Sequence, residues 1–534
     1  MTDLQFKVST AGKNGHCTMQ VLFGDELRFS DKIDLSSDKS RSTFALKVHE
    51  RFPAIDVSTI ETQLLGILKS KTSPTKRRTR EIDPERLIRH ERFITPEVCG
   101  ISVPVMVEKE GAAFGTWKTY LQLPDGTRQM AKRKAYIKTA TGKWWLWPEP
   151  ASVTPSLKNR WSAASRKKFL HENYSPDPVE VFHRMTDAVN RFIDFSHGQQ
   201  ALASLVSIYA MLSFSFRCWP AIGYLHLTGP AGSGKTRLSD VIGRMAFNCS
   251  STSNTTAPNL FREIHSNGGL FIVDEIERLN SNDPAQAEVQ SILLGGYRKG
   301  AYAGRQEPMG NGKFRSVNYD IYCPKVLACI NTLPPTLATR CIRVPMFRSL
   351  PGSETVKKSL DENLGLWQGI QNDLHCLALS QGTIWQELTK RHDCVPKISG
   401  RQRELWQPIL SIAEWLDSLG AGKILPTLQQ FALDNLREFT TAGVPEDDET
   451  LLKLLAKAVC NGERPTCGEI LERAKSVNLN AFSKWSERHV SNRLQSYHLT
   501  PKKVGSRREF REVDVQHFRQ IQSSYHIDLN LPDA

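Results

Sequence analysis

The chain has 534 residues, which is too long for a single hydrophobic core and indicates three or four domains. Its composition, 40% hydrophobic and 24% charged, is typical of a soluble globular protein, and no apolar run reaches the roughly 18 residues that a membrane span requires. The net charge of +14 favours a polyanionic partner, with nucleic acid ahead of an anionic surface.

The N-terminal residues lack the apolar segment of a signal peptide, so we expect a cytoplasmic protein that has no membrane partner. The eleven cysteines include no C-x-x-C pair, which favours reduced core thiols over disulfides or zinc.

Residues 1–68 are expected to form a small α+β module. Apolar residues alternate along its first part as in strands, and four near its end have helical spacing: Ile60, Leu64, Leu65 and Leu68. Residues 69–90 are expected to be a basic linker, because Lys69–Arg80 is KSKTSPTKRRTR and has no apolar residue except proline. A solvated spacer and an arm that holds phosphates both fit this composition.

Residues 91–155 are expected to form a β-rich module. Its runs ISVPVMVEKE, GTWKTYLQLPDGTRQM and KWWLWPEP favour strands, and Pro124-Asp125-Gly126 predicts a turn that folds the middle run into a hairpin. The tryptophans of the last run suit base stacking or one buried face of a strand: Trp144, Trp145 and Trp147. We find no catalytic constellation in either N-terminal module.

A phosphate-binding loop follows two helical stretches that begin at Pro178. The segment LHLTGPAGSGKTRLSD matches G-x-x-x-x-G-K-[ST] at every fixed position, between a strand pattern and a helix pattern. We expect Lys235 to reach the β- and γ-phosphates of ATP and Thr236 to hold Mg²⁺, with the helix N-terminus adding positive charge. The predicted nucleotide-binding residues are Gly229, Pro230, Ala231, Gly232, Ser233, Gly234, Lys235 and Thr236.

Two carboxylates follow a second buried strand in GLFIVDEI, Gly269–Ile276. At the carboxyl end of a parallel strand they would meet the ligand, so Asp274 is expected to hold Mg²⁺ and Glu275 to orient the attacking water. Acidic residues also suit the start of a helix, but about forty residues after a phosphate loop we favour the catalytic interpretation.

A glycine-punctuated basic insert lies between Tyr297 and Tyr319, and it predicts a hairpin that binds a phosphate backbone. Its candidate DNA-binding residues are Arg305 and Lys313, and an exposed loop without a partner is the alternative. The next strand, CPKVLACIN, ends in Asn331, which suits either contact with the γ-phosphate or attacking water, or a turn.

Arg340, in LATRCIRVPMF, is expected to reach the nucleotide of a neighbouring subunit and to stabilise charge on the transferring phosphoryl group. A surface ion pair is the alternative role, and Arg343 is the competing candidate.

This order of features resembles that of AAA+ ATPases, and more narrowly the helicase-like ATPases of phages, plasmids and genomic islands, related to superfamily 3 and MCM-type helicases. The segment GRQRELWQPILSIAEWL, Gly400–Leu416, is similar to the family's lid helix, with Ile409 where leucine is usual. The resemblance covers residues 175–530. It implies an ATPase core over residues 175–348, a helical lid over residues 349–440, Arg401 as the sensor 2 arginine at the γ-phosphate, and a ring, expected to be a hexamer, whose channel receives the basic hairpin.

The C-terminal residues 445–530 are expected to form a winged helix. Three helical runs, the third beginning near Ser483, precede the basic pieces of PKKVGSRREFREVDV. The third run is expected to keep Arg493 available and to enter a DNA groove, while the wing meets phosphates; docking to a protein is the alternative. The candidate DNA contacts are Lys484, Arg488, Lys502, Lys503, Arg507 and Arg508.

The sequence therefore predicts a multidomain α/β protein that hydrolyses ATP with Mg²⁺ and moves along DNA as a ring-forming, replicative-type helicase of a mobile element. Single-stranded DNA is expected in the channel and duplex at the winged helix. An ATP-dependent switch, loader or defence ATPase without unwinding activity, and a DNA-binding initiator or regulator that uses ATP to oligomerise, remain as alternatives.

Overall fold

The chain folds into two compact units, Met1–Asp83 and Pro84–Ala534. The computed structural model describes residues 4–11, 16–24, 26–72, 83, 86–109, 111–132, 136–146, 161–195, 199–253, 255–274, 276, 283–310, 312–330, 333–349, 352–391, 395, 398–525 and 527–532. Most of the predicted linker lies outside these residues, as do Trp147, Glu275 and Asn331. No helix in the described ranges is long and apolar enough to cross a membrane.

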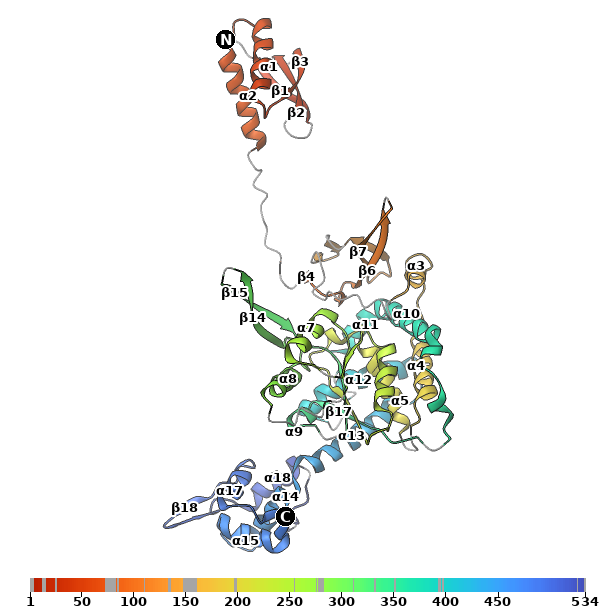
Figure 1. Ribbon diagram of the computed structural model, residues 1–534, viewed down its shortest axis with the longest axis vertical. Helices are drawn as coiled ribbons and strands as arrows, with labels where there is room; N and C mark the ends of the chain where they lie inside the picture. The colour runs from red at the N-terminus through yellow and green to blue at the C-terminus, as the bar shows by residue number, and fades with distance from the viewer. Residues whose placement is uncertain are drawn as a thin grey trace. The chain divides into compact units, whose positions relative to one another are not determined.

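The first unit is an antiparallel sheet of order β1-β2-β3 with two helices, α1 and α2 (Figure 1). Alternate residues of β2 are buried, and α1 and α2 cover that face with Phe44, Val48, Ile60 and Leu64. The period-two burial is what one packed sheet face requires. The elements are β1 Leu4–Ala11, β2 His16–Phe23, β3 Glu26–Asp34, α1 Asp38–Arg51 and α2 Val57–Thr72.

The second unit begins with two small sheets, ordered β4-β10-β9 and β5-β6-β7-β8. The turn at residues 123–127 joins β7 to β8, and in it Gly126 N donates to Leu123 O at 3.0 Å. The strands are β4 Leu87–Ile88, β5 Arg92–Ile94, β6 Cys99–Lys109, β7 Ala112–Gln122, β8 Arg128–Lys132, β9 Tyr136–Thr139 and β10 Gly142–Leu146. We call residues 86–146 the β-rich module.

One face of this module is continuous with the core of the α/β domain. Ile101, Val103 and Tyr120 belong to the same buried cluster as Trp161. Arg128 Nη1 donates to the carbonyl oxygens of Phe169 at 3.1 Å and Tyr174 at 2.7 Å. The module is therefore packed onto the α/β domain and is not a separately packed domain.

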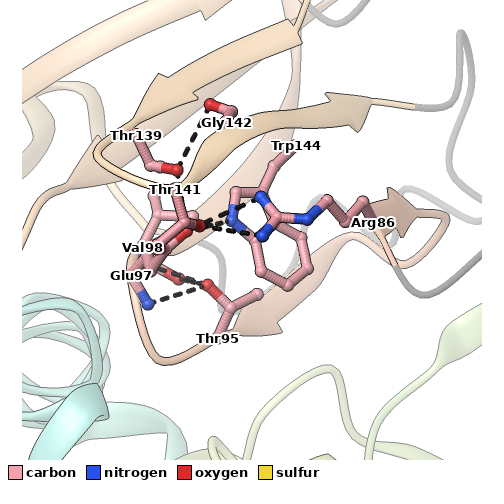
Figure 2. A network of polar contacts seen from close by, with 8 residues as sticks. All are labelled: Arg86, Thr95, Glu97, Val98, Thr139, Thr141, Gly142 and Trp144. Atoms are coloured by element: carbon pink, nitrogen blue, oxygen red, sulfur yellow. Dashed lines mark hydrogen bonds and ion pairs between the residues drawn. The ribbon is translucent and has the colours of Figure 1, made fainter. Parts of the chain in front are cut away.

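Glu97 links the two small sheets (Figure 2). Its Oε2 accepts hydrogen bonds from Thr139 Oγ1 and Trp144 Nε1, both at 2.7 Å, and Arg86 lies 4.0 Å away. Hydrogen bonds from Thr141, Trp144 and Thr139 lower the pKa of Glu97 to about 2. The indole N–H of Trp144 thus has a hydrogen-bond partner within the module. This structural role explains a tryptophan at this position without invoking a stacked nucleic-acid base.

Glu97→Gln is expected to destabilise the module by about 1–2 kcal/mol at neutral pH, because it weakens charge-assisted hydrogen bonds. A carboxyl group whose pKa is lowered in the folded state stabilises the fold at pH values above its unfolded-state pKa. That stabilisation is lost as the pH falls through the folded-state pKa. The difference in melting temperature between the wild type and Glu97→Gln should therefore shrink between about pH 4.5 and pH 2. Glu108→Gln, on an exposed residue of β6, is the control, and a pH-independent difference would contradict the assignment.

The α/β domain is built on a parallel sheet of order β12-β13-β16-β11-β17. All residues of β13 and β16 are buried, as expected for a parallel sheet that is covered on both faces. Its strands are β11 Tyr224–Thr228, β12 Ser250–Thr252, β13 Phe271–Val273, β16 Lys325–Cys329 and β17 Cys341–Pro345.

Helices surround this sheet and share its hydrophobic core. The helix over the expected lid segment, α12, packs with α13 against α5. The helices are α3 Ala163–His171, α4 Pro178–Phe192, α5 Gln200–Leu212, η2 Phe216–Cys218, α6 Lys235–Met245, α7 Ala257–Asn267, α8 Pro284–Gly295, α9 Pro335–Ala338, η4 Glu354–Lys357, η5 Asp361–Asn363, α10 Leu364–Ser380, α11 Gly382–Leu388, α12 Gly400–Ser418 and α13 Ile424–Gly443.

The predicted basic insert is an antiparallel hairpin of β14, Tyr302–Gly310, and β15, Lys313–Asp320. Figure 1 shows it extending outward beside α7. Phe261 of α7 packs against Tyr319 at the base, with ring centroids 4.7 Å apart.

The C-terminal part contains five helices and a short hairpin among the described residues. Its core includes Leu451, Ile470, Val490 and Phe518. The elements are α14 Glu446–Cys460, α15 Cys467–Val477, α16 Leu479–Phe482, α17 Glu487–Gln495, β18 Lys502–Val504, β19 Arg507–Glu509 and α18 Val515–Tyr525.

Two sequence-based expectations for this region are wrong in detail. The third helical run does not begin near Ser483, because Ser486 caps a separate helix by accepting from His489 N at 3.3 Å. Arg493 is only partly available to a ligand, because its Nε donates to the buried carboxylate of Asp448 at 2.6 Å while 37% of its side chain is exposed. Tyr497 binds the other oxygen of Asp448 at 2.9 Å.

Candidate functional site

The segment predicted to bind phosphate connects the carboxyl end of β11 to α6. Gly234 caps α6 with φ +87, a left-handed conformation that glycine adopts without strain. A Cβ on Gly229 would lie 2.2 Å from Met346 O, so this position also requires glycine. The six residues Gly229–Gly234 therefore form a tight loop whose geometry explains the glycines at positions 229 and 234.

Lys235 and Thr236 lie at the first turn of α6. Lys235 is 9% exposed, and its Nζ donates to Gly229 O at 2.8 Å and Pro230 O at 3.0 Å. Thr236 Oγ1 donates to Asp274 Oδ2 at 2.9 Å. The structure thus brings together the hydroxyl and the carboxylate that the sequence predicts as magnesium ligands, and oxygen ligands of these types are those that Mg²⁺ prefers.

Asp274 follows β13 directly, and its backbone N donates to Thr252 O at 2.9 Å. Asp240, one turn after Thr236 in α6, has a raised pKa, first because of burial and further because of repulsion from Asp274. Asp240 and Asp274 therefore lie near enough to repel each other, and a cation bound between them and Thr236 would offset that repulsion. Glu275 and Asn331 lie outside the described residues, so their catalytic roles stay predictions.

A cavity of about 390 Å³ opens beside the loop. Ser233 contributes a buried hydroxyl, and no hydrogen-bond partner for it is found among the described residues. The lining residues include Phe192, Asp194, Gly232, Ser233, Arg237, Phe347 and Arg348. Arg237 is held by carbonyl oxygens, with Nε 2.9 Å from Phe192 O and Nη2 3.1 Å from Thr355 O.

Arg348 is a residue of the candidate site that no motif in the sequence indicates. Its Nε and Nη2 donate to Ala231 O at 3.0 and 2.8 Å, which places the exposed guanidinium against the phosphate loop. The signal available in the sequence was its position three residues after β17, the strand next to β11. A single arginine at that distance from a strand is not distinctive, and only the sheet order brings it to the loop.

Arg340 lies at the opposite edge of the sheet. Tyr224 N, at the start of β11, donates to Arg340 O at 3.0 Å, whereas the phosphate loop leaves the other end of that strand. At ~3.3 Å per residue the two ends of this five-residue strand are roughly 13 Å apart. The backbone of Arg340 therefore lies at the far end of β11 from the loop of its own chain, and its Nε donates to Leu294 O at 2.8 Å.

Arg401 lies beside Arg340, since Nη1 of each bonds Thr339 Oγ1, at 2.9 Å for Arg401 and 3.5 Å for Arg340. Burial and then repulsion from Arg401 lower the pKa of Arg340. No ion pair joins either arginine to an acidic residue in the described part of the chain. Arg343 lies instead within β17, where Asn435 Nδ2 donates to its carbonyl oxygen at 2.8 Å.

The two candidate residues of the hairpin have different surroundings. Arg305 contacts Glu288 and lies 4.5 Å from the ring centroid of Phe261, so it fixes the hairpin to α8 and α7. Lys313 is exposed near the tip, next to Phe314, which is 65% exposed, and close to Met309, which is 64% exposed. The tip thus combines a cation with two exposed apolar side chains.

The C-terminal candidates Lys484, Arg488, Lys502, Lys503, Arg507 and Arg508 are all exposed. Lys484 lies between α16 and α17, and Arg488 lies in α17. Lys503 and Arg508 are directly opposite each other in the β18–β19 hairpin. Like charges in cross-strand positions are destabilising, and a bound polyanion would offset the repulsion.

Comparison with known proteins gives structural likenesses only. No protein-family model and no curated protein matches the sequence. A structure of the active helicase Cch of SCCmec type IV is 12% identical, with 98% of this chain and 95% of that chain covered and a TM-score of 0.39.

Two further likenesses are weaker. The full-length MCM homologue from Methanopyrus kandleri is 12% identical, with coverages of 76% and 90% and a TM-score of 0.33. The JCV helicase is 15% identical, with coverages of 48% and 66% and a TM-score of 0.21. Superposition at these scores is poor, so the functional assignment depends on this chain's own residues.

Proposed function

We propose that this protein is an ATP-hydrolysing DNA motor that works as a ring of identical subunits. The observation that carries the proposal is the placement of two groups on opposite edges of one sheet. The phosphate loop, with Thr236 and Asp274, lies at the carboxyl edge, and the arginine pair Arg340 and Arg401 lies at the amino edge. Each half is chemically incomplete without the other.

Head-to-tail association would complete both halves, because the amino edge of one subunit would face the carboxyl edge of the next. Contacts of this heterologous type produce a ring when the rotation from one subunit to the next closes. In such a ring Arg340 and Arg401 meet the γ-phosphate held by a neighbouring subunit, which assigns Arg401 to its partner's nucleotide and not to its own. A hexamer of the AAA+ type, with residues 349–440 as its lid, is the assembly that we expect.

The roles of the residues around ATP follow from their positions. Thr236 and Asp274 would hold Mg²⁺, which supplies charge neutralisation at the phosphates when it is bound. Lys235 would exchange its two carbonyl partners for phosphate oxygens. Glu275 is assigned to orienting the attacking water and Asn331 to the γ-phosphate, both on the basis of sequence position.

DNA would be held at two places. Lys313, with exposed apolar neighbours at the hairpin tip, suits a single strand in the ring channel, because a cation binds phosphate while apolar groups contact bases. The C-terminal residues 445–530 suit duplex DNA as a winged helix, because exposed cations gather on the β18–β19 hairpin, where Lys502 alone of the candidates has a described ion pair, with Glu512. Cytoplasmic replication of a mobile genetic element is the setting that these activities suit.

The first test is the steady-state ATPase rate with and without single-stranded and duplex DNA, followed by strand displacement on a forked substrate. Stimulation by DNA together with unwinding would support the motor. An ATPase that is indifferent to DNA would indicate a switch or loader. If Glu275→Gln leaves cellular function intact while Lys235→Ala does not, the protein would instead be a regulator that needs ATP only to assemble.

Arg348→Ala is expected to weaken ATP binding about 10-fold, or ~1.4 kcal/mol, because the guanidinium lines the cavity beside the loop and can reach a bound nucleotide. Arg348→Lys should retain part of the affinity. Isothermal titration with ATP and ADP measures both variants against Lys357→Ala, a nearby exposed cation that pairs with Glu354. Wild-type affinity in Arg348→Ala would remove this residue from the site.

A further inference from the structure

The β-rich module is joined to the α/β domain through three consecutive polar residues, His90, Glu91 and Arg92, which we call the junction strip. Arg92 opens β5, an edge strand of the module's sheet, and Glu91 O accepts from Ser102 N of β6 at 2.8 Å. Glu91 is 3% exposed and Arg92 is 5% exposed. Charged side chains are rarely buried this deeply without a specific role.

The junction strip faces two parts of the α/β domain, the connection between α6 and β12 and the short helix η2. Glu91 Oε2 accepts from Asn248 Nδ2 at 3.1 Å, in the connection between α6 and β12. The guanidinium of Arg92 lies near Cys218 of η2, and its three nitrogens have no hydrogen-bond partner among the described residues. A buried cation of this kind costs stability, so stability alone does not explain the junction strip.

His90 reaches the base of the hairpin through η2. Its Nε2 lies 3.4 Å from Arg217 Nη1, and the same Nη1 donates to Asp320 Oδ2 at 2.8 Å. Asp320 is the last residue of β15 and lies opposite Tyr302, the first residue of β14. The ion pair is largely buried, with 21% and 16% of the two side chains exposed.

Asp320 is also fixed from two other directions. Its Oδ1 accepts from Tyr322 N at 3.0 Å, and its own N donates to His265 Nδ1 of α7 at 3.1 Å. Nearby, Lys325 Nζ donates to Gly296 O at 3.2 Å and to Ile321 O at 3.0 Å, and so holds the segments that enter and leave the hairpin. Several contacts therefore hold the base, and the ion pair to Arg217 is the one that leads toward the β-rich module.

The length of the hairpin amplifies any change at this base. Lys313 lies seven positions before Asp320 in β15, so the tip is roughly 23 Å away at ~3.3 Å per residue. A tilt of about 5° at the base would move Lys313 by about 2 Å. Contacts to a phosphate backbone depend on displacements of that size.

We propose that the β-rich module sets the position of the β14–β15 hairpin through the relay His90–Arg217–Asp320, and thereby tunes how the hairpin engages DNA. His90, Arg217 and Asp320 are positioning residues in this relay and do not contact the nucleotide. The DNA part of the inference rests on the proposed function, whereas the mechanical link between the module and the hairpin base does not.

The test compares His90→Ala and His90→Gln with the wild-type full-length protein. His90→Ala should leave the melting temperature and the basal ATPase rate unchanged and should raise the concentration of single-stranded DNA for half-maximal ATPase stimulation at least about 5-fold. His90→Gln, whose side-chain oxygen can accept from Arg217, should restore much of the loss. Lys138→Ala, an exposed residue of β9 outside the relay, should behave as the wild type.

Hydrogen exchange of the hairpin peptides separates this inference from the proposed function. His90→Ala should speed exchange near Tyr302 and Asp320 at least about 3-fold without any DNA present. In one outcome, the wild-type ATPase rate does not rise with DNA while His90→Ala still speeds hydrogen exchange at the hairpin base. That outcome would support the relay and contradict the proposed function. Unchanged exchange at the hairpin base in His90→Ala would overturn the relay, whatever the protein does with DNA.

Discussion

Lys235→Ala is expected to remove measurable ATP binding and to lower the steady-state ATPase rate by at least about 100-fold, equivalent to ~2.7 kcal/mol. The ammonium lies inside the loop, 2.8 Å from Gly229 O and 3.0 Å from Pro230 O. Charge-assisted hydrogen bonds from a buried cation to phosphate are among the strongest that a protein makes. Loss of one such donor commonly lowers turnover by a factor of 10²–10³.

Binding and turnover should be measured on the same preparation, with Lys390→Ala as the control. Lys390 is exposed and pairs with Glu387 within its own segment, so its removal should leave both quantities unchanged. The melting temperature of Lys235→Ala should remain close to that of the wild type, because the side chain holds only the loop's own carbonyl oxygens. A variant that keeps its fold and still hydrolyses ATP at the wild-type rate would exclude this loop as the catalytic site.

The sequence alone indicates the candidate nucleotide site, because phosphate binding requires particular residue types at fixed spacing. Gly229, Gly234, Lys235 and Thr236 are each required locally, and Asp274 follows a strand that is apolar throughout. Their meeting in space needs only that parallel strands place their carboxyl ends together.

Other parts of the site have no such local signature. Arg348 reaches Ala231 because β17 is the neighbour of β11, and no spacing rule in the sequence gives that sheet order. The relay joins His90 to Asp320 across 230 positions of the chain.

The errors in the C-terminal region have a similar cause. Arg493 is a plausible DNA contact by composition, but a buried Asp448 45 residues earlier binds it. The sequence predicts a third helical run from near Ser483, whereas the capping hydroxyl of Ser486 starts a separate helix at Glu487. Side-chain caps and distant carboxylates override periodicity when they satisfy groups that would otherwise lack a partner.

Arg340→Ala is expected to reduce ATPase turnover at least about 100-fold while leaving ATP affinity within about 2-fold of the wild type. The arginine is on the far edge of the sheet from its own loop, so it should contribute to the transition state in a neighbour and not to binding in its own subunit. The same separation of binding from turnover is expected for Arg401→Ala, whose guanidinium shares Thr339 with Arg340.

Mixing two inactive variants tests the shared site directly. In a ring assembled at random from equal amounts of Lys235→Ala and Arg340→Ala subunits, a site is intact when an unaltered loop faces an unaltered arginine. That arrangement occurs at roughly one interface in four, so the mixture should recover roughly a quarter of the wild-type rate per subunit. The control mixes Lys235→Ala subunits with subunits that carry both Lys235→Ala and Arg340→Ala. No subunit in that mixture has an intact loop, so no interface can pair an intact loop with an intact arginine.

The recovered rate discriminates between two ways of completing the site. If Arg340 reached the loop of its own chain, neither variant could supply what the other lacks, and the mixture would stay as inactive as its components. Recovery near a quarter would require that the γ-phosphate be held by one subunit and stabilised by the next. The separation of the two edges of the sheet favours that outcome, because moving Arg340 to its own loop would break its bonds to Leu294 and to the start of β11.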